Sequence, residues 1–207
     1  MANEAAPGKD ALAQLPSFDV PDLRPMLYRA VDQAGGLIAG VRPEHHGLAP
    51  PCNDIDVVTL VGHLLRAVKR AGATGPGEPP SGPSASADLP VDEWQAAFEE
   101  SAAQVHSAWA DDSLLDRTFR MPFGEFPGRV AVAALFEEIT THGWDLAAAT
   151  GQLDRLDPEL ARVALGIAQA MVPAERRGGP MPFGPVVDVP ANADPYSQLA
   201  GYLGRQP

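Results

Sequence analysis

Apolar residues recur at helical spacing in six separate stretches of this chain. Within each stretch, an apolar residue returns every third or fourth position, which places a continuous apolar stripe on one face of a helix. The pattern predicts helices at residues 22–39, 57–71, 91–109, 130–150 and 157–171, and a short one after Asp194 and Pro195. Amphipathic helices repeated in this way, with little strand signal, predict an all-α bundle whose sites are assembled from facing helices.

Strand signal is confined to two short runs. Residues 118–124 contain an extended run that ends at Pro-Phe-Gly, and the sequence leaves open whether they form a hairpin or an irregular loop. Residues 186–189 are Val-Val-Asp-Val, which suggests a short edge strand. Neither run changes the all-α prediction.

Residues that start and stop helices fall where the apolar stripes begin and end. Asp22 is a candidate N-cap for the first helix, and Asn53, Asp54 and Asp56 are candidates for the second. Asp157 and Asp194 each precede a proline, the combination that commonly opens a helix. Gly151 is expected to end the long fourth helix as a C-terminal cap.

Composition divides the chain into three parts. Residues 1–21 are polar and punctuated by proline, which predicts a flexible tail. Residues 22–151 are expected to form the bundle, and residues 152–207 a helical and irregular C-terminal extension packed on it. Within the bundle, residues 72–90 are rich in Gly, Pro and Ser and predict a flexible connection.

Charge and cysteine content exclude several classes of function. The formal net charge of −12 argues against nucleic acid or an anionic membrane surface as partner, because both attract clustered Lys and Arg. Neither a leader peptide nor a membrane-spanning run is recognisable, so we expect a cytoplasmic protein. The single cysteine, Cys52, excludes an internal disulfide and a cysteine-based zinc cluster. Histidines and carboxylates are therefore the candidate metal ligands.

The candidate chemistry centres on Glu138 and His142 in the fourth predicted helix. His142 lies within the apolar stripe and Glu138, one turn earlier, lies on its edge, so both are expected to face the interior. A carboxylate among apolar neighbours is costly unless it is paired or bound to a cation. Two such residues one turn apart can bind one ion. Taken alone, the pair is more often a flanking Glu beside a hydrogen-bonded core His, so a third ligand is needed.

The other histidines give weaker signals. His63 falls off the strongest stripe of the second helix, and periodicity alone makes it a boundary or surface residue. His106 flanks the stripe of the third helix and is more often a partly buried, hydrogen-bonded residue than a ligand. His45 and His46 lie in a proline-rich loop and are expected to be solvated.

Several motifs together resemble a known family. They are Pro51-Cys52, Asp56-Val57, Leu60-Val61-Gly62-His63-Leu64, Glu138-Ile139-Thr140-Thr141-His142-Gly143-Trp144-Asp145-Leu146-Ala147 and Thr150-Gly151. This combination is similar to the DinB-like superfamily, and most similar to the actinobacterial branch that includes the mycothiol-dependent maleylpyruvate isomerase N-terminal domain. The resemblance runs from Arg24-Pro25 to the C-terminus. One departure is Ile55, where that branch often has Trp.

The resemblance implies a DinB-like four-helix bundle, here with an irregular C-terminal extension, that holds one divalent ion. The implied ligands are His63 from the second helix and Glu138 and His142 from the fourth. Zinc is the first expectation, although nickel, iron and manganese also suit these ligands. Asp145, three residues after His142, is a candidate for orienting a ligand, or equally for a helix-face hydrogen bond or salt bridge.

Three protein ligands leave a coordination position open, as in catalytic rather than structural zinc sites. Cys52, as a lone cysteine, is more often a packing residue than a nucleophile, so a nucleophile would come from outside. In superfamily members with known activity, a small thiol such as mycothiol occupies the open position and attacks an electrophilic substrate. The resemblance therefore implies a mycothiol-dependent S-transferase or a maleylpyruvate-isomerase-like enzyme.

Two alternatives stay open at this point. The first is a metal-binding protein without catalytic turnover. The second is metal-assisted hydrolysis, which needs a general base near the ion, and Asp145 is the one nearby candidate. The sequence also leaves the oligomeric state open, with a homodimer among the options.

Overall fold

The computed structural model describes residues 20–52, 55–73, 89–121, 124–177 and 183–207. Within them lie six α-helices and one two-stranded antiparallel sheet, joined by short 3-10 turns. The helices are α1 (Arg24–Ala39), α2 (Val57–Ala73), α3 (Trp94–Ala108), α4 (Gly128–Thr150), α5 (Pro158–Met171) and α6 (Pro195–Tyr202). The strands are β1 (Thr118–Met121) and β2 (Gly124–Pro127). The all-α prediction is confirmed.

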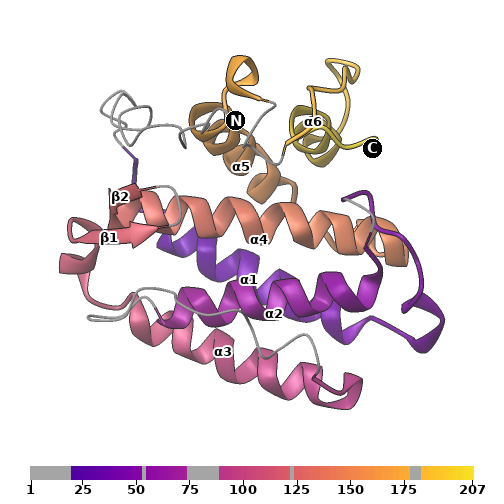
Figure 1. Cartoon of the computed structure of the whole chain (residues 1–207), viewed down its shortest axis with the longest axis horizontal. Helices are drawn as coiled ribbons and strands as arrows, with labels where there is room; N and C mark the ends of the chain where they lie inside the picture. Colours follow the sequence, from indigo (N-terminus) through magenta and orange to yellow (C-terminus); the bar gives the residue numbers. More distant parts are fainter. Residues whose placement is uncertain (1–19, 53–54, 74–88, 122–123, 178–182) are drawn as a thin grey trace, which may run out of the picture.

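Helix α4 runs through the middle of the fold (Figure 1). Helices α1, α2 and α3 lie on one side of it, and α5 and α6 lie on the other. Because α4 has neighbours on both sides, most of its residues are buried, and its sequence is apolar around much of its circumference. Among the described residues, no helix combines the length and apolar character needed to span a membrane.

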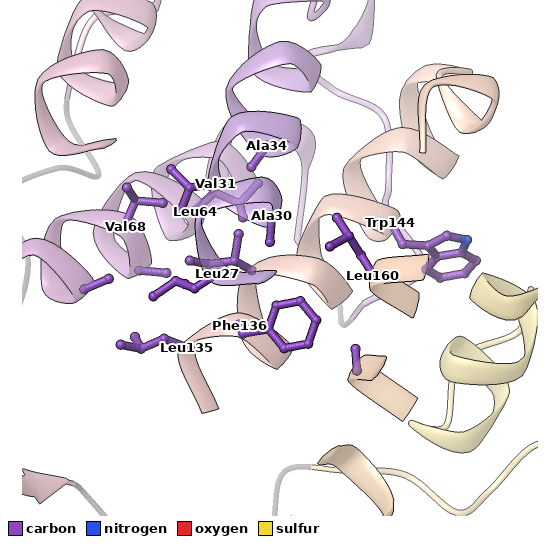
Figure 2. Close-up of a cluster of buried hydrophobic side chains, with 14 of the residues drawn as sticks. Leu27, Ala30, Val31, Ala34, Leu64, Val68, Leu135, Phe136, Trp144 and Leu160 are labelled. Atoms are coloured by element: carbon purple, nitrogen blue, oxygen red, sulfur yellow. The ribbon is translucent and has the colours of Figure 1, made fainter. Parts of the chain in front are cut away.

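The core lies where α1, α2 and α4 meet (Figure 2). Leu27 and Val31 of α1, Leu64 of α2 and Phe136 of α4 are fully buried there. Each large apolar side chain removed from water contributes about 1.5–3 kcal/mol. Leu160 of α5 is also fully buried, so one continuous core joins the bundle to the C-terminal helices.

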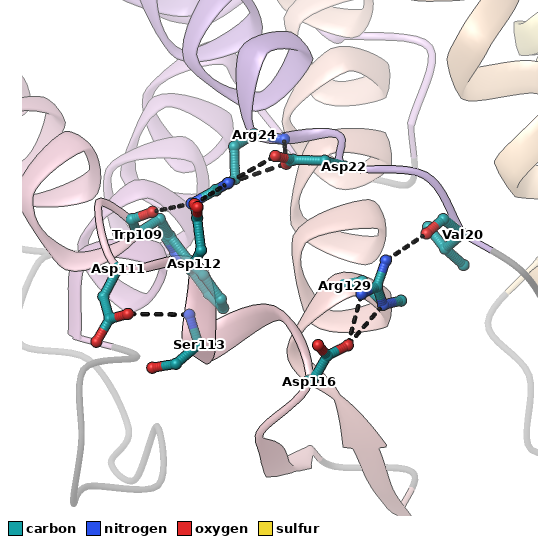
Figure 3. Close-up of polar contacts among 9 residues, drawn as sticks. All are labelled: Val20, Asp22, Arg24, Trp109, Asp111, Asp112, Ser113, Asp116 and Arg129. Atoms are coloured by element: carbon teal, nitrogen blue, oxygen red, sulfur yellow. Dashed lines mark hydrogen bonds and ion pairs between the residues drawn. The ribbon is translucent and has the colours of Figure 1, made fainter.

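Arg24 and Arg129 form hydrogen bonds that connect segments at the N-terminal end of the bundle (Figure 3). The Arg24 guanidinium donates to the carboxylates of Asp22 and Asp112, the latter at 2.6 Å. Arg129 donates to the carbonyl oxygen of Val20 at 3.1 Å. Val20 is fully buried, whereas residues 1–19 of the predicted tail lie outside the described residues.

Within the described residues, which leave out Asn53 and Asp54, the predicted helix caps agree with the structure except at Asp22. Gly151 ends α4 in the left-handed conformation, with φ 70°. The Asp157 and Asp194 carboxylates accept backbone N–H groups at the starts of α5 and α6. Helix α1, however, begins after Leu23 without a side-chain cap. Asp22 lies one residue too early to be the N-cap and accepts the backbone N–H of Arg24 instead.

The two strand-like runs have different outcomes. Strands β1 and β2 pair antiparallel with Phe119 opposite Phe126, as the hairpin alternative requires, while residues 122–123 lie outside the described residues. Residues 186–189 are not a strand, so that expectation is wrong. They make one backbone hydrogen bond, from Val187 N to the Gly201 carbonyl at 2.9 Å. The run is bracketed by Pro185 and Pro190, which cannot donate to a ladder.

Candidate metal centre

The structure places His63 of α2 beside Glu138 and His142 of α4. His63 Nε2 lies 3.3 Å from Glu138 Oε1, and the His63 and His142 rings meet edge to face with their centroids 4.5 Å apart. The exposed fractions of the three side chains are 32%, 26% and 20%, so the cluster is reachable from solvent. The geometry is that of a half-buried site rather than a sealed core.

His63 reaches this position because α2 has two neighbours. The strongest apolar stripe of α2, which contains Leu60 and Leu64, is fully buried. Helix α2 contacts both α3 and α4, so its inward-facing arc is wider than one stripe. His63 lies at the edge of that arc, facing α4. Periodicity correctly placed it at a boundary but did not indicate which helix it would face.

His63 and Glu138 have the spacing of two ligands of one ion, whereas the set of three donor atoms that lie within 4.8 Å of one another in the described residues is Cys52, His142 and Asp145. His63 Nε2 is buried and lies in ion-pair contact with Glu138 Oε1, but none of its contacts within the described residues meets hydrogen-bond geometry. Two ligands of one tetrahedral zinc ion, each about 2.1 Å from it, lie about 3.4 Å apart. The observed separation of 3.3 Å between His63 Nε2 and Glu138 Oε1 matches that spacing. An ion bound between them would be coordinated by both atoms.

Arg70 shares the Glu138 carboxylate. Its Nη2 donates to Glu138 Oε2 at 2.5 Å, and it lies on α2 seven residues after His63, two turns along the same face. Burial raises the pKa of Glu138, but the interactions with His63 and Arg70 outweigh it and bring that pKa to about 2. Glu138 is therefore ionised at neutral pH, as a metal ligand must be.

Asp145 contacts the His142 ring. Asp145 is fully buried, and its Oδ2 lies 3.0 Å from His142 Nδ1. This contact leaves Nε2 as the nitrogen that His142 can offer to a metal. Histidines that bind metals commonly use the other ring nitrogen in this way, as a donor to a carboxylate. The contact expected between Asp145 and a candidate ligand is thus present.

Asp145 also binds Arg205, a residue that the sequence did not indicate as part of the site. Arg205 donates from Nε to Asp145 Oδ1 at 2.7 Å and from Nη2 to Oδ2 at 2.8 Å. Burial raises the pKa of Asp145, but the bonds from His142 and Arg205 lower it below its usual range. Asp145 is consequently a charged hydrogen-bond acceptor with both oxygens committed, which makes it a poor general base.

Cys52 adjoins this pair. One ligand atom each from Cys52, His142 and Asp145 lie within 4.8 Å of one another, close enough by spacing to hold a metal ion. Burial, followed by the nearby Asp145 charge, raises the pKa of the Cys52 thiol to about 12. A bound metal would deprotonate this thiol, but Arg205 already occupies both oxygens of Asp145. These side chains therefore fit a hydrogen-bonded support for His142 better than a second ligand set.

Glu137 adds another carboxyl group beside the centre. The Thr141 hydroxyl donates to Glu137 Oε1 at 3.0 Å. Burial is the largest cause of a rise in the pKa of Glu137 to about 7. This group therefore changes protonation near neutral pH, next to a carboxylate that stays ionised. Glu137 carries no sequence signal of its own, because it precedes Glu138 and lies outside the Glu-x-x-x-His spacing.

The remaining histidines contact other side chains. His106 is exposed and stacks on Tyr28 with ring centroids 4.1 Å apart. His45 is buried, contrary to the expectation that it is solvated, because its Nδ1 accepts the backbone N–H of Arg42 at 3.2 Å and so closes the turn. His46 is half-buried and lies against Trp94. We find no contact between these side chains and His63, Glu138 or His142 in the described part of the chain.

Comparison with known proteins identifies two relatives. No protein-family model matches this chain. The uncharacterized proteins MT0763 and Rv0738 of Mycobacterium tuberculosis, from strains CDC 1551 and H37Rv, are each 37% identical to it over 179 residues. The match covers 86% of this chain and 94% of each relative, so the correspondence is nearly end to end.

Among solved structures, the chain is similar to crystal structures of the mycothiol-dependent maleylpyruvate isomerase and of a mutant of that enzyme. The TM-score is 0.49 and the sequence identity 18%. The match covers 62% of this chain and 61% of the isomerase chain, so this chain spans about three fifths of that enzyme.

Proposed function

The chain belongs to the same family as the Mycobacterium tuberculosis proteins MT0763 and Rv0738, and we propose that it is a divalent-metal-binding protein that uses a small thiol. In this proposal His63, Glu138 and His142 hold the ion. The reaction is thiol transfer to an electrophile or thiol-assisted isomerisation, with mycothiol as the first candidate thiol. The proposed compartment is the cytoplasm, where small thiols are kept reduced.

One observation carries the metal proposal. His63 Nε2 is a buried nitrogen without a hydrogen-bond partner among the described residues, and it faces the ionised Glu138 carboxylate at the spacing of two ligands of one ion. The His142 ring adjoins it, held from behind by Asp145. Three donors on two facing helices form a set that suits zinc and leaves a position open.

The proposal of an external thiol rests on the poor suitability of Cys52, the one cysteine of the chain, as the nucleophile. A divalent ion bound there would supply Lewis-acid activation, lowering the pKa of a coordinated thiol. Cys52 is unsuited to act as that thiol, because it is buried and an external electrophile has little access to its sulfur. The nucleophile would therefore come from a separate molecule. The motif resemblance to the mycothiol-dependent branch of the DinB-like superfamily supports a small thiol in this role.

A metal-binding protein without turnover is the second candidate. Arg70 is engaged with Glu138, and Asp145 has both oxygens bonded to Arg205. These contacts occupy the Glu138 and Asp145 carboxylates, so neither carboxylate is free to act as a general base toward a bound substrate. Metal-assisted hydrolysis requires such a base, and Glu137, whose pKa is raised to about 7, would have to supply it.

Metal analysis tests the ligand set. We expect untagged protein, purified and then saturated with zinc, to hold about one equivalent by elemental analysis. His63→Ala, Glu138→Ala and His142→Ala should each abolish stoichiometric binding while the helical circular dichroism is retained. His106→Ala is the matched control, since His106 is exposed and contacts Tyr28. Full zinc affinity in His63→Ala would refute the proposed set, and loss of zinc in Cys52→Ser would place the ion at Cys52, His142 and Asp145.

Thiol titration separates the two candidate functions. Calorimetry of the zinc-loaded protein with mycothiol should show saturable binding that disappears in the metal-free protein. Turnover of an electrophile such as a chlorodinitrobenzene or a cis-configured enoic acid should then require both thiol and metal. Stoichiometric metal with neither thiol binding nor turnover would support the binding protein instead.

A further inference from the structure

The strongest unassigned feature is the buried ion pair behind His142. Asp145 is fully buried, and the Arg205 side chain is only 10% exposed. The two groups make two hydrogen bonds, one to each carboxylate oxygen, across 60 residues of sequence. Placing two charges inside a protein is costly, and replacing such a pair by apolar groups is often neutral or stabilising. Stability alone is therefore a weak reason for this pair.

The backbone delivers Arg205 to Asp145 through the end of α6. Gly204 has φ 84°, in the left-handed region. The Gly204 N–H bonds to the Gly201 carbonyl, and the Arg205 N–H bonds to the Ala200 carbonyl at 2.9 Å. These two bonds form the glycine-dependent helix stop known as the Schellman motif, with Arg205 immediately after the turn. The turn reverses the chain and directs Arg205 inward toward α4.

The two bonds from Arg205 determine the direction of the Asp145 carboxylate. A carboxylate held at one point can rotate about its Cβ–Cγ bond, whereas a guanidinium that binds both oxygens fixes its plane. Oδ2 then points at His142 Nδ1, 3.0 Å away. The orientation of the His142 ring, and with it the direction of Nε2, thus depends on the C-terminal segment.

We propose that Arg205 is a positioning residue of the candidate metal centre: it orients Asp145, which in turn holds His142 Nδ1 so that Nε2 faces His63 and Glu138. The C-terminal segment after α6 is then part of the site rather than an appendage. This inference rests on the proposed metal-binding function for its consequence. Its geometric part, the orientation of His142, can be tested without metal.

Three variants test the proposal. Arg205→Gln removes both the positive charge and the guanidinium that binds the two carboxylate oxygens. Arg205→Lys keeps the charge but cannot bind both oxygens in one plane. Arg177→Gln is the matched control. Arg177 packs over the Tyr202 ring of α6 at 4.3 Å, so its loss disturbs the same segment without touching Asp145. Circular dichroism and thermal unfolding establish that each variant is folded.

The first measurement uses metal-free protein. Nitrogen-15 correlation spectra of the histidine rings, with His142 assigned from His142→Ala, report which ring nitrogen carries the proton. We expect a proton held on Nδ1 in the wild type and in Arg177→Gln, and a tautomer mixture in Arg205→Gln. An unchanged Nδ1 proton in both Arg205 variants would overturn the proposal.

The second measurement uses cobalt(II) as a coloured substitute for zinc. Changes to groups that orient metal-bound histidines typically weaken metal affinity 10- to 100-fold. We expect about a tenfold loss with an altered visible spectrum in Arg205→Gln, a smaller loss in Arg205→Lys, and wild-type values in Arg177→Gln. Equal losses in Arg205→Gln and Arg177→Gln would overturn the proposal. If the wild type binds no cobalt while the tautomer still changes, the metal function fails and the positioning of His142 by Arg205 stands.

Discussion

Arg70 Nη2 and Glu138 Oε2 lie 2.5 Å apart, so a protein cation contacts the carboxylate that the candidate metal centre would use. The two residues come from α2 and α4, the same pair of helices that supplies His63 and His142. The guanidinium can stabilise Glu138 when no metal is bound. It also competes with a divalent ion for the carboxylate and repels it.

This competition predicts that Arg70→Gln binds zinc more tightly than the wild type. Removing a nearby positive charge at a partly exposed site should raise the affinity several-fold, and more at low ionic strength, where screening is weaker. Competition titration against a chromophoric chelator measures the change. Lys69→Gln is the matched control, because it removes the same charge from an exposed position of the same turn. An equal gain in both variants would mean that overall charge is responsible, and a loss in Arg70→Gln would mean that Arg70 orients Glu138 productively.

Glu137 predicts a pH dependence of stability in the metal-free protein. Burial raises its pKa from 4.5 to about 7, so the folded state binds this proton more tightly than the unfolded state does. The resulting stabilisation is fully present below pH 4.5 and is lost as the pH rises to about 7. Glu137→Gln, which stays neutral, should therefore match the wild type near pH 4.5 and be more stable at pH 8, by up to about 3 kcal/mol.

Urea unfolding in the presence of a chelator measures this difference at the two pH values. Glu100→Gln is the control, because Glu100 is exposed on α3 and should show no such pH-dependent gain. A constant difference between Glu137→Gln and the wild type across this range would show that Glu137 is not buried as a neutral acid.

Cys52 predicts a thiol that is inert in the folded protein. It is 5% exposed, and its pKa is raised to about 12 by burial and by Asp145. Because the thiolate is the reactive form, alkylation by iodoacetamide at pH 8 should be more than about a thousandfold slower than for an exposed cysteine. Mass spectrometry should show full labelling only after urea unfolding. Rapid labelling of the native protein would make Cys52 available as an internal nucleophile and would remove the argument for a borrowed thiol.

Sequence reasoning was most successful where the relevant contacts are local. The helical stripes predicted α1 to α6 within a few residues, and Gly151 ends α4 as expected, because both signals depend on neighbouring positions. Glu138 and His142 could be paired for the same reason. Asp22 was misassigned by one residue, since a capping preference does not by itself fix where a helix begins.

The contacts that define the site's electrostatics depend on packing between helices, which periodicity does not report. His63 is a boundary residue on its own helix and becomes part of the cluster only because α4 lies beside it. Arg70 could have been suspected, since it follows His63 by two helical turns on the same face. The sequence indicates Arg205 only weakly, through a glycine at the end of a short helix that is followed directly by a basic residue. Its partner Asp145 is 60 residues away, so only the folded structure joins them.

Gly204 offers a final test of how the C-terminal turn serves the site. Its φ of 84° strains any residue with a side chain, and a Cβ there would lie 3.0 Å from the Pro185 carbonyl oxygen. Gly204→Ala should lower stability by about 1–2 kcal/mol. It should also weaken zinc binding several-fold, because the turn that carries Arg205 must shift.

Gly151→Ala is the comparison, since Gly151 has a φ of 70° but open space around a Cβ. It should cost about 1 kcal/mol through the same backbone strain and leave zinc affinity unchanged. Thermal unfolding and chelator competition on both variants measure the two effects separately. Unchanged zinc affinity in a destabilised Gly204→Ala protein would mean that the C-terminal turn supports the fold without supporting the metal centre.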